Sequence, residues 1–215
     1  MPSIGTSTGA APVSGEHDDR PVAVSYRGVS RTFTTAKRTF TAVQGIDLEV
    51  RKGEFICIIG PSGCGKSTLL NMAAGLLQQT TGEVLYDGRP LRGINNDVGY
   101  VTQKDTLLPW RTVEKNVSLP LEVQKVPRRE RKQRVTEVLD LVGLGQYGNR
   151  YPSQLSGGML KRAALAQTLV YRPNTLLMDE PFGALDAQLR LNLQRQTLDI
   201  WERERKTVLF VTHDL

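Results

Sequence analysis

One stretch of the chain limits its possible folds more than any other. The glycine-rich segment at 60–67, GPSGCGKS, follows the apolar run FICII and precedes the apolar pattern TLLNMAAGLL. A loop of the form G-x-x-x-x-G-K-[ST] between a strand and a helix lets backbone amides surround a polyphosphate. The alternative is an ordinary glycine turn, which leaves the spacing and context unexplained. The sequence therefore predicts a phosphate-binding loop in which Lys66 reaches the terminal phosphates and Ser67 offers its hydroxyl to magnesium.

A second motif places two acids at the end of an apolar strand. Residues 175–181 read TLLMDEP. The carboxyl end of a parallel strand is where α/β folds bind ligands, so we expect Asp179 to hold the magnesium shell. Glu180 is then available to polarise the attacking water. The competing interpretation is a pair of acids that are simply solvated, and the glycine-rich loop weighs against it.

Apolar segments alternate with helical patterns along the chain, which indicates an α/β fold with a parallel sheet. Helical patterns dominate from about 112 to 171 and recur at 186–204. The run at 54–59 is expected to be a fully buried strand, with an inert Cys57 inside it. The expected strands are VAVSYRGV, IDLEV, EFICII, GEVLYDG, VGYV, TLLM and TVLFVT.

Composition narrows the class of protein. The longest apolar runs fall far short of the roughly 18 residues that a membrane span needs, so we expect a soluble, cytoplasmic chain. Two cysteines give neither a disulfide framework nor metal-ligand spacing. The net charge of +6 fits an anionic partner or plain solubility. The basic run at 127–134 contains no aromatic residue, so nucleic-acid binding is not expected.

Five segments together resemble the ATP-binding subunit of ABC transporters over about residues 22–215: GPSGCGKST, LSGGM, LLMDEP, ALD and VTHD. The resemblance implies a P-loop NTPase of ABC type, with a mostly parallel sheet core, an antiparallel β subdomain and an α-helical subdomain at about 104–172. Residues 1–20 are then a disordered tail and 21–215 the ATP-binding domain. The family continues past His213 with another helix and strand, so the resemblance also implies truncation at the C-terminus.

The resemblance implies ATP and Mg²⁺ as ligands and assigns a role to each matching residue. Its catalytic residues are Glu180, His213 and Gln103, and its magnesium residues are Ser67, Gln103 and Asp179. The residues placed against ATP are Gly60, Pro61, Ser62, Gly63, Cys64, Gly65, Lys66, Ser67, Thr68, Phe33, Ser156, Gly157, Gly158 and Asp186.

Several of these residues have a structural alternative. Phe33, expected to stack on adenine, competes with core packing and with Phe40 for that role. Gln103 is otherwise an ordinary polar loop residue, and His213 otherwise a structural histidine at a strand end. Asp186 and Ser156 are also suited to cap helices, which is compatible with their expected roles.

The resemblance of the segment LSGGM to the family implies that the chain works together with a second copy of itself. In the family this stretch of one subunit closes over the nucleotide of the other, so Ser156, Gly157 and Gly158 are expected to bind a γ-phosphate in trans. Met159 stands where the family usually has glutamine. Met159 and the segments TQKDTLLPWRTVEKNV and DEPFGALDAQ resemble the nitrate, sulfonate and taurine importer branch.

The resulting hypothesis is a peripheral ATPase on the cytoplasmic face of the membrane that energises import of a small oxyanion. Its expected partners are separate permease subunits, a second copy of itself and, indirectly, a solute-binding protein. Residues 107–110, LLPW, would form an apolar lip that receives a permease helix, unless they pack internally. The alternatives are the ATPase of an exporter, a soluble ABC ATPase acting on nucleic acid, and a P-loop kinase or GTPase outside the family. The segment LKRAALAQ departs from the branch and leaves the solute open.

Overall fold

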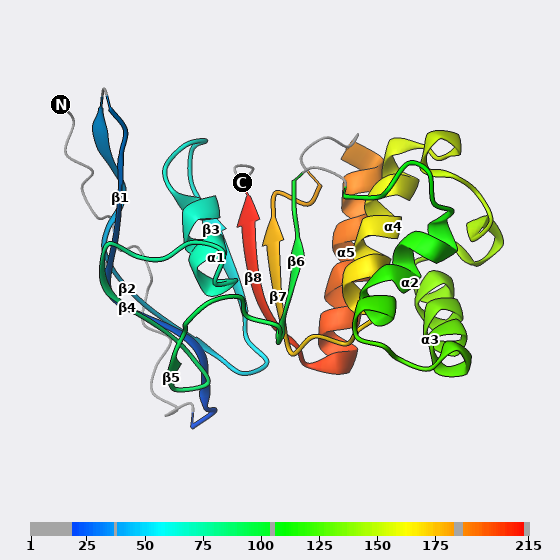
Figure 1. The fold of residues 1–215 in the computed structure, drawn as a ribbon, viewed down its shortest axis with the longest axis horizontal. Coiled ribbons are helices and arrows are strands. Elements are labelled where there is room, and N and C mark those ends of the chain that lie inside the picture. The colour runs from blue at the N-terminus through cyan, green and yellow to red at the C-terminus, as the bar shows by residue number, and fades with distance from the viewer. Residues whose placement is uncertain (1–18, 37, 104–105, 183–186, 213–215) are drawn as a thin grey trace.

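The chain folds into an antiparallel sheet, a parallel sheet and a block of helices, arranged side by side (Figure 1). The computed structural model describes residues 19–36, 38–103, 106–182 and 187–212. The antiparallel sheet, in the order β2-β1-β4-β5, contains β1 (Val22–Thr34), β2 (Thr39–Arg51), β4 (Thr81–Tyr86) and β5 (Arg89–Pro90). The parallel sheet, in the order β3-β8-β7-β6, contains β3 (Phe55–Ile59), β6 (Val98–Val101), β7 (Thr175–Asp179) and β8 (Thr207–Thr212). The expected α/β class, with its mixture of parallel and antiparallel sheets, is confirmed.

The helices are distributed unequally around the parallel sheet. The helices are α1 (Lys66–Ala73), α2 (Val113–Val123), α3 (Arg128–Leu141), α4 (Gly157–Leu169) and α5 (Ala187–Glu204), with short 3-10 turns η1 (Gly145–Tyr147) and η2 (Pro152–Gln154). Helix α1 lies on the side of the antiparallel sheet, whereas α2 to α5 lie on the other side (Figure 1). Among the described residues, no helix is both long enough and apolar enough to cross a bilayer.

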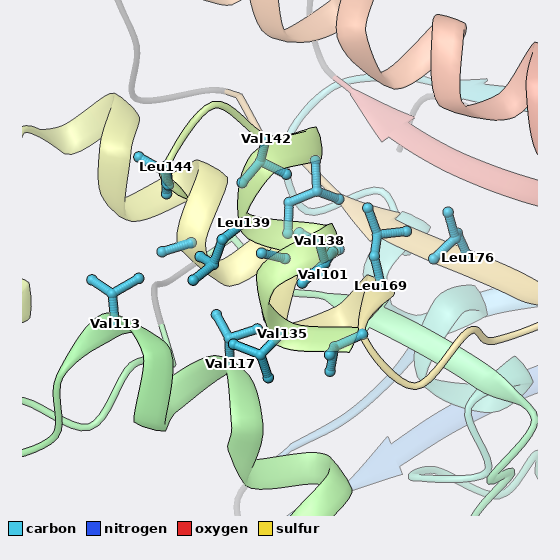
Figure 2. Packing of buried hydrophobic residues seen from close by; sticks show 14 of the residues in the cluster. Val101, Val113, Val117, Val135, Val138, Leu139, Val142, Leu144, Leu169 and Leu176 are labelled. Carbon is cyan, nitrogen blue, oxygen red and sulfur yellow. The ribbon is translucent and has the colours of Figure 1, made fainter. Parts of the chain in front are cut away.

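The central strands β7 and β8 are apolar between their end residues because both of their faces are buried there. Leu177 of β7 and Leu209 of β8 belong to a cluster that includes α1 and the antiparallel sheet. Their neighbours Leu176, Met178 and Val208 belong to a second cluster, which is built mainly by α2, α3 and α4 (Figure 2). Successive side chains of a strand point to opposite faces, so each strand serves both clusters.

The expectation of a fully buried strand at 54–59 is wrong. Within the described part of the chain, β3 is the edge strand of its sheet and pairs with β8 alone. Cys57 is consequently exposed, whereas the central strand β8 is buried along five of its six residues. An apolar run alone does not distinguish an edge strand from a central one, because the distinction depends on which segments pair beside it.

Strands β1 and β2 extend further than the alternating pattern predicted. The patterns covered 22–29 and 46–50, yet the two strands pair from Val22↔Arg51 to Thr34↔Thr39. Register shifts interrupt the ladder at several points. The long antiparallel pairing supplies backbone hydrogen bonds even where polar side chains break the alternation.

Candidate active site

The glycine-rich loop lies between β3 and α1, as predicted. Gly63 and Gly65 have φ values of 81° and 99°, in the left-handed region that glycine adopts without strain. A Cβ atom on Gly65 would lie 2.4 Å from the carbonyl oxygen of Ala42 in β2. The end of the antiparallel sheet therefore presses against the loop, and glycine is required at 65 for both conformation and space.

Lys66 is held inside this loop. Its side chain is buried, and its Nζ donates hydrogen bonds to the carbonyl oxygens of Gly60 at 2.7 Å and Pro61 at 2.9 Å. The ammonium group thus lies across the loop, at the first residue of α1. A positive charge at a helix N-terminus, surrounded by loop amides, is suited to a bound polyphosphate.

Ser67 and Asp179 meet as the two motifs predicted. The Ser67 hydroxyl donates to Oδ1 of Asp179 at 2.9 Å, although the two residues are 112 positions apart. A hydroxyl and a carboxylate are oxygen ligands of the kind that Mg²⁺ prefers, alongside phosphate oxygens and water. The pair therefore fits a magnesium ion held at the mouth of the loop.

Tyr100 is a member of the site that the sequence did not single out. Its hydroxyl forms a side-chain hydrogen bond with Asp179. Burial, reinforced by the charge and hydrogen bond of Asp179, raises the pKa of Tyr100 well above its usual range. The phenol therefore stays protonated beside the carboxylate that accepts a hydrogen bond from Ser67. The parallel pairing of β6 with β7 brings the ends of the two strands together, and no local spacing in the sequence signals the contact.

Glu180 and Gln103 lie together beside this pair. Nε2 of Gln103 donates to Oε2 of Glu180 at 3.2 Å. Glu180 has φ 45°, an uncommon conformation for a residue with a Cβ atom, and its amide donates to the carbonyl of Val211 at 3.0 Å. Strained conformations of this kind persist where surrounding structure fixes them, and they cluster at functional sites. The expected base and the expected sensor glutamine therefore share one location.

Phe33 and Phe40 stack on each other near the end of the β1–β2 hairpin. Their ring centroids are 5.4 Å apart, and Arg31 lies 4.6 Å above the ring of Phe33. Neither ring belongs to the two described core clusters, which argues against the core-packing interpretation of Phe33. Phe40 lies on β2, two residues before Ala42, and the carbonyl of Ala42 lies against Gly65 of the loop. The aromatic pair therefore stays a candidate for stacking on the adenine ring.

The segment LSGGM begins helix α4. Ser156 is the N-cap, and its hydroxyl accepts a hydrogen bond from the amide of Met159 at 3.4 Å. Ser156 and Gly157 are exposed, and a Cβ atom added to Gly157 would meet no atom within 4 Å. The capping role is therefore confirmed, while the packing of this chain gives no reason for glycine at 157.

Two buried polar side chains connect this region to its surroundings, and the sequence pointed to neither. Lys161 of α4 donates from Nζ to the backbone carbonyl of Gln103 at 2.5 Å. The fully buried Asn116 of α2 accepts from the amide of Leu108 and donates to the carbonyls of Leu108, Arg111 and Thr112. The Asn116 network fixes the backbone of the lip at 107–110.

Two expected site residues cannot be placed. Asp186 and His213 lie outside the described residues, so their expected roles stay predictions. The other expected residues gather around the loop and the carboxyl ends of β6 and β7, except for Phe33, which lies near the end of the β1–β2 hairpin, and for those of LSGGM, which begin α4.

The fold and this site define a P-loop nucleoside triphosphatase. Residues 43–183 match the ABC transporter family. Among its relatives, a nitrate import ATP-binding protein of Synechococcus elongatus is 45% identical over 189 residues, covering 87% of this chain and 69% of the relative. An aliphatic sulfonates import ATP-binding protein of Bacillus cereus is 43% identical over 192 residues, covering 89% and 75%. A dimeric ATP-binding cassette solved in a post-hydrolysis state with ADP and phosphate is 34% identical, with a TM-score of 0.80 and coverage of 89% and 88%. The chain belongs to the ABC transporter family and is an ATP-hydrolysing subunit of that family.

Nucleotide should protect one of the two cysteines from alkylation. Sγ of Cys64 lies 4.0 Å from Nζ of Lys66 inside the loop, whereas Cys57 is on the exposed edge strand. We expect saturating MgATP to slow N-ethylmaleimide labelling of Cys64 by roughly tenfold or more, since bound phosphates occupy the loop around it. Partial burial raises the pKa of the Cys57 thiol and slows its labelling, but equally with and without nucleotide. Peptide mass spectrometry measures both rates in one sample, and unprotected Cys64 would contradict phosphate binding in this loop.

Proposed function

We propose that this subunit hydrolyses ATP to energise a membrane importer of a small oxyanion such as a sulfonate, taurine or nitrate. The observation that carries the proposal is the convergence of Lys66, Ser67, Asp179, Glu180 and Gln103 at one edge of the parallel sheet. Import and the class of solute are supported by the nitrate and sulfonate relatives. The proposed location is the cytoplasmic face of the membrane, attached through permease subunits.

The proposed chemistry assigns one task to each group. Lys66 would exchange its loop carbonyls for phosphate oxygens, and Ser67 and Asp179 would hold Mg²⁺, which would neutralise phosphate charge. Glu180 takes the proton of the attacking water at a carboxylate oxygen. Gln103, which already donates to that carboxylate at 3.2 Å, orients Glu180 and the water.

We further propose that two copies of the chain enclose ATP between them. Ser156 and Gly157 are exposed at the start of a 13-residue helix, so their amides and hydroxyl are accessible to another molecule. A helix N-terminus favours an anion. Within one copy, Ser156 caps α4 rather than contacting the loop at 60–67, which is why the phosphate it binds would belong to the partner's nucleotide.

The lip at 107–110 is the proposed docking surface for a permease helix. Leu107 packs against the helical core cluster and Leu108 is half-buried, so these two residues follow the internal-packing alternative. Trp110, in contrast, is 72% exposed. The Asn116 network holds the backbone around it rigidly. A rigid, exposed tryptophan is the type of residue that dominates binding at protein interfaces.

Replacing Trp110 by alanine should weaken permease association by roughly thirtyfold, because truncating an interface tryptophan commonly costs about 2 kcal/mol or more. Solute uptake should fall with it. The matched control is Val123→Ala, since Val123 is 74% exposed at the far end of α2. Both variants should keep the parental unfolding midpoint. The measurements are pull-down of the co-expressed permease and uptake of labelled taurine and nitrate in one strain, and normal association of Trp110→Ala would rule out this docking surface.

The solute is tested separately from the docking surface. A gene deletion should abolish growth on a sulfonate or nitrate as the only sulfur or nitrogen source, and the intact gene should restore it. Unchanged growth on both the sulfonate and nitrate would refute the class of solute alone. Loss of efflux rather than uptake would favour the exporter.

A further inference from the structure

Lys161 forms a direct bond between helix α4 and the segment that follows β6. Its side chain is buried, with 8% of its surface exposed, and its Nζ donates to the backbone oxygen of Gln103 at 2.5 Å. Burying an ammonium group is costly unless strong partners compensate, and hydrogen bonds from charged donors are the stronger kind. The buried ammonium group of Lys161 therefore links two segments that lie 58 positions apart in the sequence.

The two ends of this bond belong to different ATP sites of the proposed dimer. On one side, the side chain of Gln103 contacts Glu180, the expected base of this copy's own site. On the other side, Lys161 lies on the helix capped by Ser156, which is expected to contact the partner's nucleotide. Five residues of helix span roughly 7 to 8 Å, so Lys161 and Ser156 move together as one rigid unit.

We propose that Lys161 is a positioning residue that couples the two ATP sites. The proposal rests on the function proposed above, in which two copies enclose ATP. When Gln103 rearranges around a bound nucleotide, its carbonyl displaces Lys161 and with it the N-terminus of α4. Occupation of one site thereby changes the placement of Ser156 over the other. Couplings of this kind typically change affinity by about 5- to 150-fold.

The experiment compares Lys161→Met with a rescue variant and a matched control. Methionine keeps the length and apolar stem of the side chain but removes the donor. Lys161→Arg keeps a charged donor. Lys206→Met removes a lysine of the same kind, whose Nζ donates to the carbonyl of Pro173 at 2.8 Å in the connection before β7, away from both expected sites.

Two measurements separate coupling from a general loss of structure. The first is the Hill coefficient of ATP hydrolysis, which we expect to exceed about 1.5 in the parent, to approach 1 in Lys161→Met, and to recover in Lys161→Arg. The second is the affinity of the isolated monomer for a fluorescent ATP analogue under dilute conditions, which should stay within about twofold of the parent because Nζ of Lys161 bonds to the backbone of Gln103 and not to its side chain. Lys206→Met should keep the parental Hill coefficient.

The outcomes are decisive in each case. An unchanged Hill coefficient in Lys161→Met, or an equal loss in Lys206→Met, would overturn the coupling role while leaving the ATPase assignment intact. A parent that shows neither cooperativity nor ATP-driven dimers would overturn the sandwich and the coupling role together. If Lys161→Met lowers the unfolding midpoint, Lys161→Leu, which also lacks a donor, replaces it, and retained cooperativity in that variant would equally refute the proposal.

Discussion

Glu180→Gln is expected to slow ATP turnover by about 10²- to 10⁴-fold while ATP-bound dimers accumulate. An amide cannot accept the proton of the attacking water, yet it keeps nearly the shape of the carboxylate and can still pair with Gln103. ATP binding should therefore survive, and the proposed dimer should persist because its ATP is not hydrolysed. With MgATP present, phosphate release measures the turnover rate and light scattering measures the fraction of dimer.

The control for this experiment is the double variant Lys66→Ala, Glu180→Gln. Lys66 is the ammonium group inside the loop, so its removal should abolish ATP binding and prevent any dimer from forming. Dimers of the double variant would show that association does not depend on bound nucleotide. Parental turnover in Glu180→Gln alone would remove Glu180 from the role of base.

Gly157→Ala should abolish ATP-driven dimerisation while leaving the subunit folded. A methyl group at 157 would meet no atom of its own chain, and Gly157 is the first residue of α4, where alanine is tolerated. The unfolding midpoint should therefore be unchanged or slightly higher. In the proposed sandwich, however, the methyl group projects into the space that the partner's γ-phosphate must approach, so dimer formation and hydrolysis should both fall by at least about 10²-fold.

The contrast that gives this test its meaning is Gly65→Ala. There the added Cβ would lie 2.4 Å from the oxygen of Ala42, so the fold itself should suffer. Dimerisation and stability of both variants are compared by light scattering and thermal unfolding. A Gly157→Ala protein that dimerises normally would contradict a trans contact at this residue.

The site was predictable where its chemistry is local or follows from topology. The loop at 60–67 is contiguous, and the meeting of Ser67 with Asp179 follows from placing two parallel strands in one sheet. Tyr100, Asn116 and Lys161 were not predictable in this way. Each of these side chains contacts a backbone carbonyl or a carboxylate in another part of the fold. The spacing of residues in the sequence does not indicate such contacts.

The fold shows the same division. Strands β7 and β8 were predicted from their apolar runs because the middle of a parallel sheet is covered on both faces. Strand β3 has an equally apolar run, and yet it lies at the edge with Cys57 exposed. Position within a sheet is a property of the neighbours, so the residues of β3 alone were insufficient.

The alternation along β7 has a consequence for how this sequence can change over time. Leu177 shares its cluster with Leu70 of α1, beneath the phosphate loop, whereas Met178 shares the other cluster with Leu169 of α4. Two residues that are adjacent in the gene are thus constrained by opposite halves of the molecule. A change of volume at 177 must be compensated on the side of α1, and one at 178 on the side of α2, α3 and α4. Substitutions at residues 177 and 178 can therefore be compensated independently, each by changes in a different core cluster.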